Sequence, residues 1–370
     1  MSEPGIQRGY LVLADLSGYT SFVVSTELEH AQGILTNLIG VLRRHLTPAL
    51  DLVEVEGDAL FLHLPERRVL RADGLLDLVE STYVAFRDLV HTMQRTARCP
   101  CQACQAIPSL DLKFVVHFGD YVLQDVGGAA KPFGTSVTLA HRLLKNSVTE
   151  RTGWPAYVLL TESALGRMGI EPPDLHRAVA TYPHLGDTPI GALDLRQRYG
   201  ELTANRRVRL AEPDAEVTLR QRFGVAAPLL WDLLCDPSRR RLWEVGSDWS
   251  LRERPAGRSG TGTQHHCAIS RFSEEVLDWR PFEYYTVRLH RGRFRFIITG
   301  ELVPDGDGTG YRWSMRHESR APRPVRALMS RLFAYRLMQM PERFRRLERL
   351  TGTLATGADP SAVAAPDRTA

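Results

Sequence analysis

Two aspartates lie where the chain could hold a divalent cation. Asp15 lies at the end of the apolar run that begins with Tyr10–Leu13, which is typical of a buried strand, and it precedes a turn. Asp58 lies in a turn between two alternating segments, Leu52–Val55 and Ala59–Leu64. Mg2+ is commonly held by one or two carboxylates, with substrate phosphates at other positions, and Mn2+ takes similar oxygen ligands. The pattern therefore predicts a Mg2+ or Mn2+ site shared by the two aspartates.

The turn after Asp15 offers a place for phosphate groups. Backbone N–H groups at the start of a helix bind anions. We expect a helix to begin just after Asp15, and its first N–H groups belong to Ser17, Gly18, Tyr19 and Thr20. Each aspartate taken singly also has a structural interpretation, because Asp15 could cap that helix and Asp58 could be an ordinary turn residue.

A cysteine cluster marks a second possible metal site. Three of the five cysteines lie close together, at Cys99, Cys101 and Cys104. Thiolates at this density favour Zn2+ or an iron–sulfur cluster. His91 from the preceding helix, or His117 from the following strand, is predicted as a further ligand. The alternative is a surface loop whose thiols are free.

In the first half of the chain, which holds both aspartates, strands and helices are predicted to alternate. Hydrophobic periodicity predicts strands over residues 10–15, 52–64 (a hairpin), 110–118 and 156–161, a strand pair over 187–195, and helices over 27–45, 72–97 and 136–146. Mixed elements with hairpins predict an α+β class, with helices over a sheet.

The second half has a different pattern. The hydrophobic periodicity weakens around residues 200–207. Beyond them the sequence predicts one strand, one short helix and then a series of strands separated by turns. A long helix is predicted over 322–350. The tail, 352–370, has no periodicity and is predicted to be disordered.

Composition limits the classes of protein that fit. A chain of 370 residues is long enough for two domains. Its 43% hydrophobic and 24% charged residues are typical of a globular protein. No apolar stretch approaches the roughly 20 residues that span a bilayer, and the first residues lack the order of a signal peptide, so we expect a cytoplasmic protein with no membrane span. The net charge of +4 is small, so no nucleic-acid partner is expected.

Three segments, 13–20, 54–58 and 133–142, give the first half a family resemblance. Residues 9–200 resemble the catalytic domain of class III nucleotidyl cyclases, the adenylate and guanylate cyclases. The resemblance implies a ferredoxin-like α/β sandwich that binds a purine nucleoside triphosphate. It also implies that Asp15 and Asp58 bind two Mg2+ ions, and that Arg142 stabilises charge on the α-phosphate.

The same resemblance gives roles to the purine and ribose positions. Glu54 falls at the purine-selecting position, where a carboxylate fits guanine, although it is equally consistent with a solvent-facing strand residue. The second purine position falls on Lys131 and the ribose position on Thr138, and both depart from the usual residue types. The family's active site forms between two subunits, so the resemblance implies a homodimer.

The second half has its own resemblance, carried by the element order and by Trp231-Asp232, Asp236-Pro237 and Trp279-Arg280-Pro281-Phe282. Residues 214–351 resemble the START and Bet v 1-like helix-grip superfamily (SRPBCC), which includes polyketide cyclases. This implies an antiparallel sheet, a long C-terminal helix and a cavity for a small hydrophobic ligand, with walls that include Trp243, Trp279 and Trp313.

These observations predict two domains and leave two functions open. Residues 1–200 form a cyclase-like domain with a cysteine-rich insertion at 98–105, residues 201–213 a linker, and residues 214–351 the helix-grip domain. The first hypothesis is a nucleotidyl cyclase, guanylyl more than adenylyl, that forms a cyclic nucleotide. The alternative is a catalytically inactive nucleotide- and metal-binding sensor coupled to a carrier of a small apolar ligand.

Overall fold

The computed structural model describes residues 5–68, 73–96, 101–204, 208–244, 246–254, 258–292 and 294–355. The chain divides into two compact units, Met1–Asn205 and Arg206–Ala370. This boundary falls inside the predicted linker. Cys99 and residues 356–370 of the predicted tail lie outside the described residues, whereas the first residues of that tail are helical.

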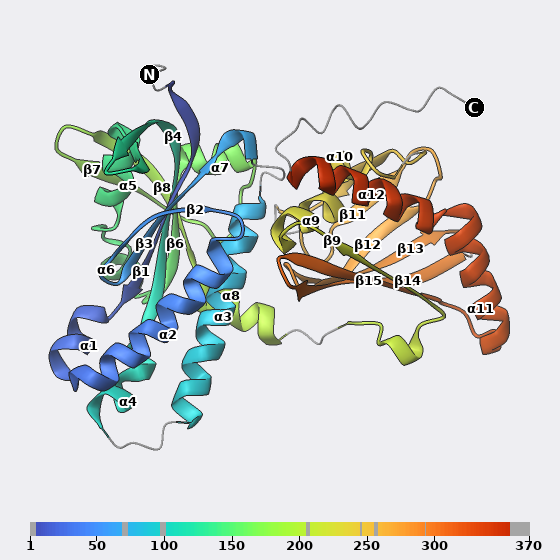
Figure 1. Ribbon diagram of the computed structural model, residues 1–370, viewed down its shortest axis with the longest axis horizontal. Coiled ribbons are helices and arrows are strands. Elements are labelled where there is room, and N and C mark those ends of the chain that lie inside the picture. Colours follow the sequence, from blue (N-terminus) through green and yellow to red (C-terminus); the bar gives the residue numbers. More distant parts are fainter. Residues whose placement is uncertain are drawn as a thin grey trace. The chain divides into compact units, whose positions relative to one another are not determined.

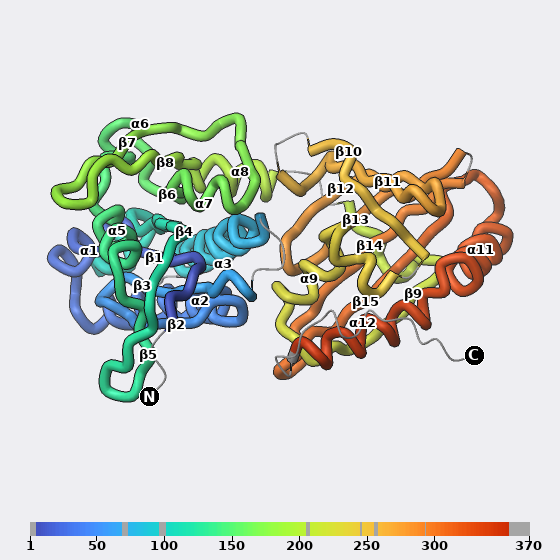
Figure 2. The backbone as a smooth tube through the Cα atoms, turned by 90° about the horizontal axis from the view of Figure 1, so that it is seen from above, coloured from blue at the N-terminus to red at the C-terminus, as the bar shows by residue number. Residues whose placement is uncertain are grey.

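The first unit is built on one eight-stranded sheet (Figure 1). Its strands are β1 (Gln7–Ser17), β2 (Asp51–Glu56), β3 (Ala59–Pro65), β4 (Asp111–Val126), β5 (Ala129–Phe133), β6 (Tyr157–Thr161), β7 (His176–Tyr182) and β8 (Gly186–Asp194). The order is β2-β3-β1-β4-β6-β8-β7. β4 pairs with β6 in parallel, and the other pairings are antiparallel. β4 continues beyond β1 and pairs there with β5 as a hairpin (Figure 2).

The helices of the first unit include those predicted over 27–45, 72–97 and 136–146. They are α1 (Tyr19–Ser25), α2 (Leu28–Leu46), α3 (Gly74–Thr96), α4 (Gln102–Ala106), α5 (Thr135–Leu143), α6 (Val148–Thr152), α7 (Glu162–Met168) and α8 (Leu195–Ala204). The two longest, α2 and α3, pack side by side (Figure 1). In α2 the buried side chains of Ile34, Leu38 and Leu42 recur at helical spacing, which explains why this segment forms an amphipathic helix.

Side-chain alternation along β1 determines where Asp15 points. Successive strand residues face opposite sides of a sheet, so Leu11, Leu13 and Asp15 share one face. Leu11 and Leu13 belong to the same buried apolar cluster as Ala140 and Leu143 of α5. Asp15 therefore lies on the sheet face that α5 covers, at the end of the row of side chains formed by Leu11 and Leu13.

The second unit is an antiparallel sheet of seven strands packed with helices. Its strands are β9 (Val217–Phe223), β10 (Trp249–Glu253), β11 (Gln264–Cys267), β12 (Ser273–Arg280), β13 (Tyr284–Arg291), β14 (Phe294–Asp305) and β15 (Gly308–His317), and its order is β10-β11-β12-β13-β14-β15-β9. Two short helices, α9 (Ala227–Cys235) and α10 (Pro237–Arg240), follow β9. The mixed α+β class is confirmed in both units, while the sub-fold names stay predictions.

The long C-terminal helix is not continuous, so that prediction was wrong. The segment consists of α11 (Arg323–Leu332), a π-helical turn (Phe333–Leu337) and α12 (Met340–Ala355). Within the π turn Phe333 is buried and stacks on Phe296 of β14, with ring centroids 4.2 Å apart. Gln339 then takes a left-handed conformation, with φ of 51°, which ends the turn. No helix among the described residues is both long and apolar enough to span a membrane.

Candidate nucleotide, metal and ligand sites

The two predicted aspartates meet at one end of the sheet. Asp15 pairs with Ala59 in the β1–β3 ladder, and Asp58 directly precedes Ala59 in the turn of the β2–β3 hairpin. Leu16 N–H donates to the carbonyl of Asp58 at 3.4 Å, which ties the two segments together. Burial and the negative charge of Asp15 both raise the pKa of Asp58. The carboxylates are therefore close enough to repel each other.

A lysine that sequence reasoning missed completes this cluster. Lys113 is the register partner of Asp15 on β4, and its Nζ lies 3.0 Å from Oδ2 of Asp15. The two side chains are only 23% and 16% exposed. Although burial opposes its charge, Asp15 and, more weakly, Asp58 raise the pKa of Lys113. The cluster therefore holds two carboxylates and one ammonium group.

The predicted phosphate turn lies beside this cluster. Ser17 is the last residue of β1, Gly18 precedes α1 with φ of 84°, and Tyr19 and Thr20 begin the helix. No side chain among the described residues caps α1. A β-carbon at Gly18 would lie 2.9 Å from the carbonyl oxygen of Ser109, so both the left-handed backbone and the close approach require glycine.

The two predicted purine positions contact each other. Lys131 of β5 donates to the carboxylate of Glu54 on β2, and each side chain is about one-third exposed. This hydrogen bond lowers the pKa of Glu54. Burial and Glu54 raise the pKa of neighbouring Glu56, which lies 3.8 Å from His141 Nδ1.

The remaining predicted nucleotide residues lie on α5. Thr138 is exposed, and its hydroxyl donates to the carbonyl of Gly134 at 3.4 Å. Arg142 is exposed in the last turn. Neither side chain contacts Asp15 or Asp58 within the described residues of the single chain, so their role stays a prediction that depends on a second copy.

The cysteine cluster has a histidine partner other than the two that were predicted. Among the described residues, the group able to share a metal consists of His30, Cys101 and Cys104. His117 instead lies 3.0 Å from the hydroxyl of Thr161 in the core, and His91 lies beside Tyr199. Within the described part of the chain, the histidine beside Cys101 and Cys104 is therefore His30, whereas His91 and His117 contact other side chains.

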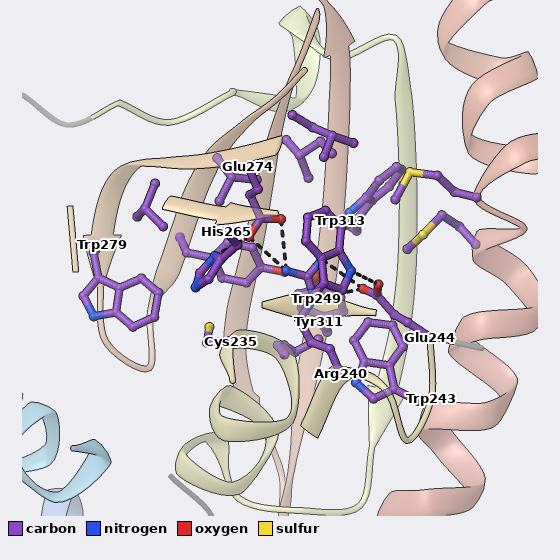
Figure 3. A pocket seen from close by; sticks show the side chains of 18 residues that line it. Cys235, Arg240, Trp243, Glu244, Trp249, His265, Glu274, Trp279, Tyr311 and Trp313 are labelled. Carbon is purple, nitrogen blue, oxygen red and sulfur yellow. Dashed lines mark hydrogen bonds and ion pairs between the residues drawn. The ribbon is translucent and has the colours of Figure 1, made fainter. Parts of the chain in front are cut away.

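The second unit encloses a small cavity beneath α12 (Figure 3). Its volume of about 40 Å3 is enough for a few water molecules, since about 10–15 Å3 admits one. The predicted wall residues Trp243, Trp279 and Trp313 all line it. Their burial shows that they belong to the core as well as to the wall.

Charged residues make this cavity more polar than was predicted. Arg240 donates to Glu274 at 2.9 Å and to Glu244 at 3.1 Å, and its guanidinium lies 4.3 Å from the ring centroid of Trp249 (Figure 3). His265 Nδ1 lies 3.0 Å from Glu274. Only tryptophans were named as predicted walls of this cavity. The signal available in the sequence was the alternation of side chains along β11, which puts His265 and Cys267 on the same face. Both side chains are buried.

Glu274 gives this network a predictable acid sensitivity. Burial alone would raise the pKa of Glu274, but Arg240 and His265 lower it to about 2. Because the folded-state pKa lies below the unfolded value of about 4.3, Glu274 stabilises the fold above that pH, and the contribution is lost as pH falls toward 2. We expect the free energy of unfolding in urea to fall between pH 5 and pH 3 by up to about 2 kcal/mol more in the native chain than in Glu274→Gln. Equal pH dependence in both proteins would contradict this assignment.

Comparisons with known proteins match parts of the chain. Residues 35–152 match the family described as "Protein of unknown function (DUF2652)", a match that includes Asp58 but not Asp15. The "Uncharacterized protein Rv2561/Rv2562" of Mycobacterium tuberculosis is 32% identical over 101 residues, which are 27% of this chain and 46% of that protein. The chain thus spans about half the length of this curated relative.

Several similar solved structures are class III cyclase domains. The guanylyl cyclase Cya2 has a TM-score of 0.41 and 14% identity, covering 51% of this chain and 92% of that one. The adenylyl cyclase CyaB from P. aeruginosa has a TM-score of 0.38 and 14% identity, with coverages of 51% and 96%. DynU16, a putative protein in the dynemicin biosynthetic locus, has a TM-score of 0.29 and 17% identity, with coverages of 39% and 48%. At these scores the likenesses assign no function to this chain.

Proposed function

We propose that the first unit binds a purine nucleoside triphosphate with Mg2+ or Mn2+ and converts it to a cyclic nucleotide. The observation that carries this proposal is the meeting of Asp15 and Asp58 at one half-buried place, where burial and Asp15 raise the pKa of Asp58. A divalent cation between the carboxylates would remove their repulsion and recruit phosphate oxygens.

The neighbouring groups fit the chemistry of that substrate. A bound cation would polarise the α-phosphate and favour loss of the proton from the ribose 3′-hydroxyl. Attack of that oxygen on the α-phosphorus forms the cyclic ester and releases pyrophosphate. The N–H groups of Tyr19 and Thr20 and the ammonium of Lys113 offer positive partners for the remaining phosphate oxygens.

A homodimer forms part of the proposal. Thr138 and Arg142 are exposed on α5 and lack a contact with the aspartates in one chain, so a second copy would supply them. Exposed Val126 and Phe133 on the β4–β5 hairpin, 51% and 62% exposed, offer apolar surface for such an association.

The purine preference rests on Glu54. A carboxylate accepts from the N1–H and amino group of guanine, whereas adenine offers an acceptor at N1. In the single chain Lys131 already occupies that carboxylate. Guanine would have to replace or share this ion pair, so we expect GTP to be favoured over ATP by a modest factor.

A panel of nucleoside triphosphates with Mn2+, read by product mass, tests the function directly. We expect pyrophosphate and a cyclic product from the native chain, with turnover lost in Asp58→Asn. Asp120→Asn is the matched control, because Asp120 is exposed and pairs with Arg8 instead. No product from any nucleotide, together with cation-dependent nucleotide binding, would leave the sensor function in place of the cyclase.

That sensor is the second candidate, and two ion pairs favour it. Lys113 neutralises Asp15 and Lys131 neutralises Glu54 without any ligand. Such a domain would bind nucleotide without turnover, while the second unit binds a small ligand. The cavity there would have to widen to admit an aromatic ligand, and its walls would then offer that ligand tryptophan rings together with the charged groups of Arg240 and Glu274.

A further inference from the structure

We propose that His30, Cys101 and Cys104 bind Zn2+, and that this ion fixes the segment on which the Gly18 turn packs. The Zn2+ site does not depend on the proposed cyclase function. Only the idea that the Gly18 turn binds phosphate rests on that function.

The three side chains are arranged as ligands of one ion. Nδ1 of His30 lies 3.1 Å from Sγ of Cys101, and the ligand atoms of all three residues lie within 4.8 Å of one another. Tetrahedral Zn2+, with bonds of about 2.3 Å to sulfur and about 2.0 Å to nitrogen, separates its ligand atoms by roughly 3.5–4 Å. Small side-chain rotations therefore suffice to place all three around one ion.

The surrounding hydrogen bonds hold these ligands in position. Sγ of Cys101 accepts from the backbone N–H of Cys104 at 3.4 Å. The carboxylate of Glu27 accepts from the N–H groups of Gln102 and Ala103 at 3.2 and 3.0 Å. The start of α4 is thus tied to the residue that precedes α2, which brings the thiols to His30. Such outer contacts orient metal ligands in known sites.

The donor set selects the class of metal. Two thiols and one imidazole are ligands typical of Zn2+, whereas Mg2+ and Ca2+ prefer oxygen. Iron–sulfur clusters generally take four cysteines, while this group contains a histidine nitrogen. His30 is exposed and both cysteines are partly exposed, so an ion has access to these three side chains.

The position of α4 connects this site to the phosphate turn. α4 contacts both α1 and α2. It continues into the 3-10 turn Ile107–Ser109, whose Ser109 carbonyl is the group that a β-carbon at Gly18 would strike at 2.9 Å. An ion that joins α2 to the start of α4 therefore restrains the surface against which the turn of Gly18 rests.

Metal content of the full chain tests the site without any nucleotide. Protein purified without chelator should contain about one Zn2+ per chain, and Co2+ substitution should give thiolate-to-cobalt absorption. We expect His30→Ala and Cys104→Ser each to weaken metal affinity by at least about tenfold. Gln32→Ala, an exposed change on the same helix α2, should leave it unaltered. The site is refuted if the native chain takes up neither metal, if both variants retain native affinity, or if the chain carries an iron–sulfur absorption band instead.

Hydrogen exchange tests the connection to the turn. Removal of Zn2+ should speed amide exchange in residues 17–20 and 102–109 several-fold, since the restraint on α4 is lost. The same change should appear in Cys104→Ser and be absent in Gln32→Ala. Unchanged exchange at 17–20 after zinc removal would overturn the connection. Because neither measurement uses a nucleotide, failure of the cyclase proposal leaves both results interpretable.

Discussion

Replacing Asp15 with asparagine should lower cation-dependent nucleotide turnover at least about a hundredfold, since charge stabilisation by a bound metal contributes several kcal/mol to a transition state. The substitution preserves size and hydrogen bonding while removing the charge that holds both Lys113 and the proposed cation. Turnover should be measured at saturating Mn2+ and again across a Mn2+ titration. We expect the loss in the maximal rate to persist at high Mn2+, because one of two carboxylates is gone.

Lys113→Met separates the two candidate functions at the same cluster. Without the ammonium, Asp15 and Asp58 repel each other more strongly, so cation affinity should rise in either case. In a cyclase, turnover should fall because Lys113 no longer contacts phosphate. In a sensor, nucleotide binding should instead tighten with the cation. Cation binding that is insensitive to both Asp15→Asn and Lys113→Met would refute a metal site here.

The sequence predicted the aspartates because their positions depend on local patterns. The apolar run before Asp15 and the Gly57-Asp58 turn are both visible in short segments, and the β2–β3 hairpin confirms the turn. Lys113 was missed because its contact with Asp15 depends on the register between β1 and β4, which are distant in sequence. His30 was missed for the same reason, since α2 meets α4 only in the folded unit.

In the second unit the apolar wall was easier to predict than the charges. Trp243, Trp279 and Trp313 are large and apolar, so a core or cavity position was the natural expectation. Arg240 was not among the predicted cavity residues, because arginine is rarely buried unless it is paired. Its partner Glu274 lies on β12, so only the tertiary fold reveals the pair.

The buried position of Arg240 explains why its loss should be costly. The side chain is 8% exposed and binds the carboxylates of Glu244 and Glu274, which are also buried. Glu244 accepts further from the indole N–H of Trp249 at 2.8 Å and pairs with Arg343 at 3.3 Å. The buried charges are therefore mutually dependent, and the pKa of Glu244 is held below its usual value despite burial.

Arg240→Met should destabilise the second unit by about 3–5 kcal/mol, because it leaves buried carboxylates without their cation. For a unit of this size that loss corresponds to a melting temperature lower by roughly 10 °C. Tryptophan fluorescence during urea unfolding is a suitable measurement, because five of the six tryptophans lie after residue 206. Arg241→Met, at an exposed neighbouring residue, is the matched control and should change stability little.

A double variant tests the physical cause. If the cost of Arg240→Met arises from the unpaired carboxylate of Glu274, adding Glu274→Met should restore part of the lost stability, since apolar replacement of a whole buried pair is often neutral. The double variant should then be more stable than Arg240→Met alone. If the two losses instead add, the arginine acts mainly through its packing on the ring of Trp249, and the charge argument fails. An Arg240→Met protein as stable as Arg241→Met would show that this network contributes nothing to the fold.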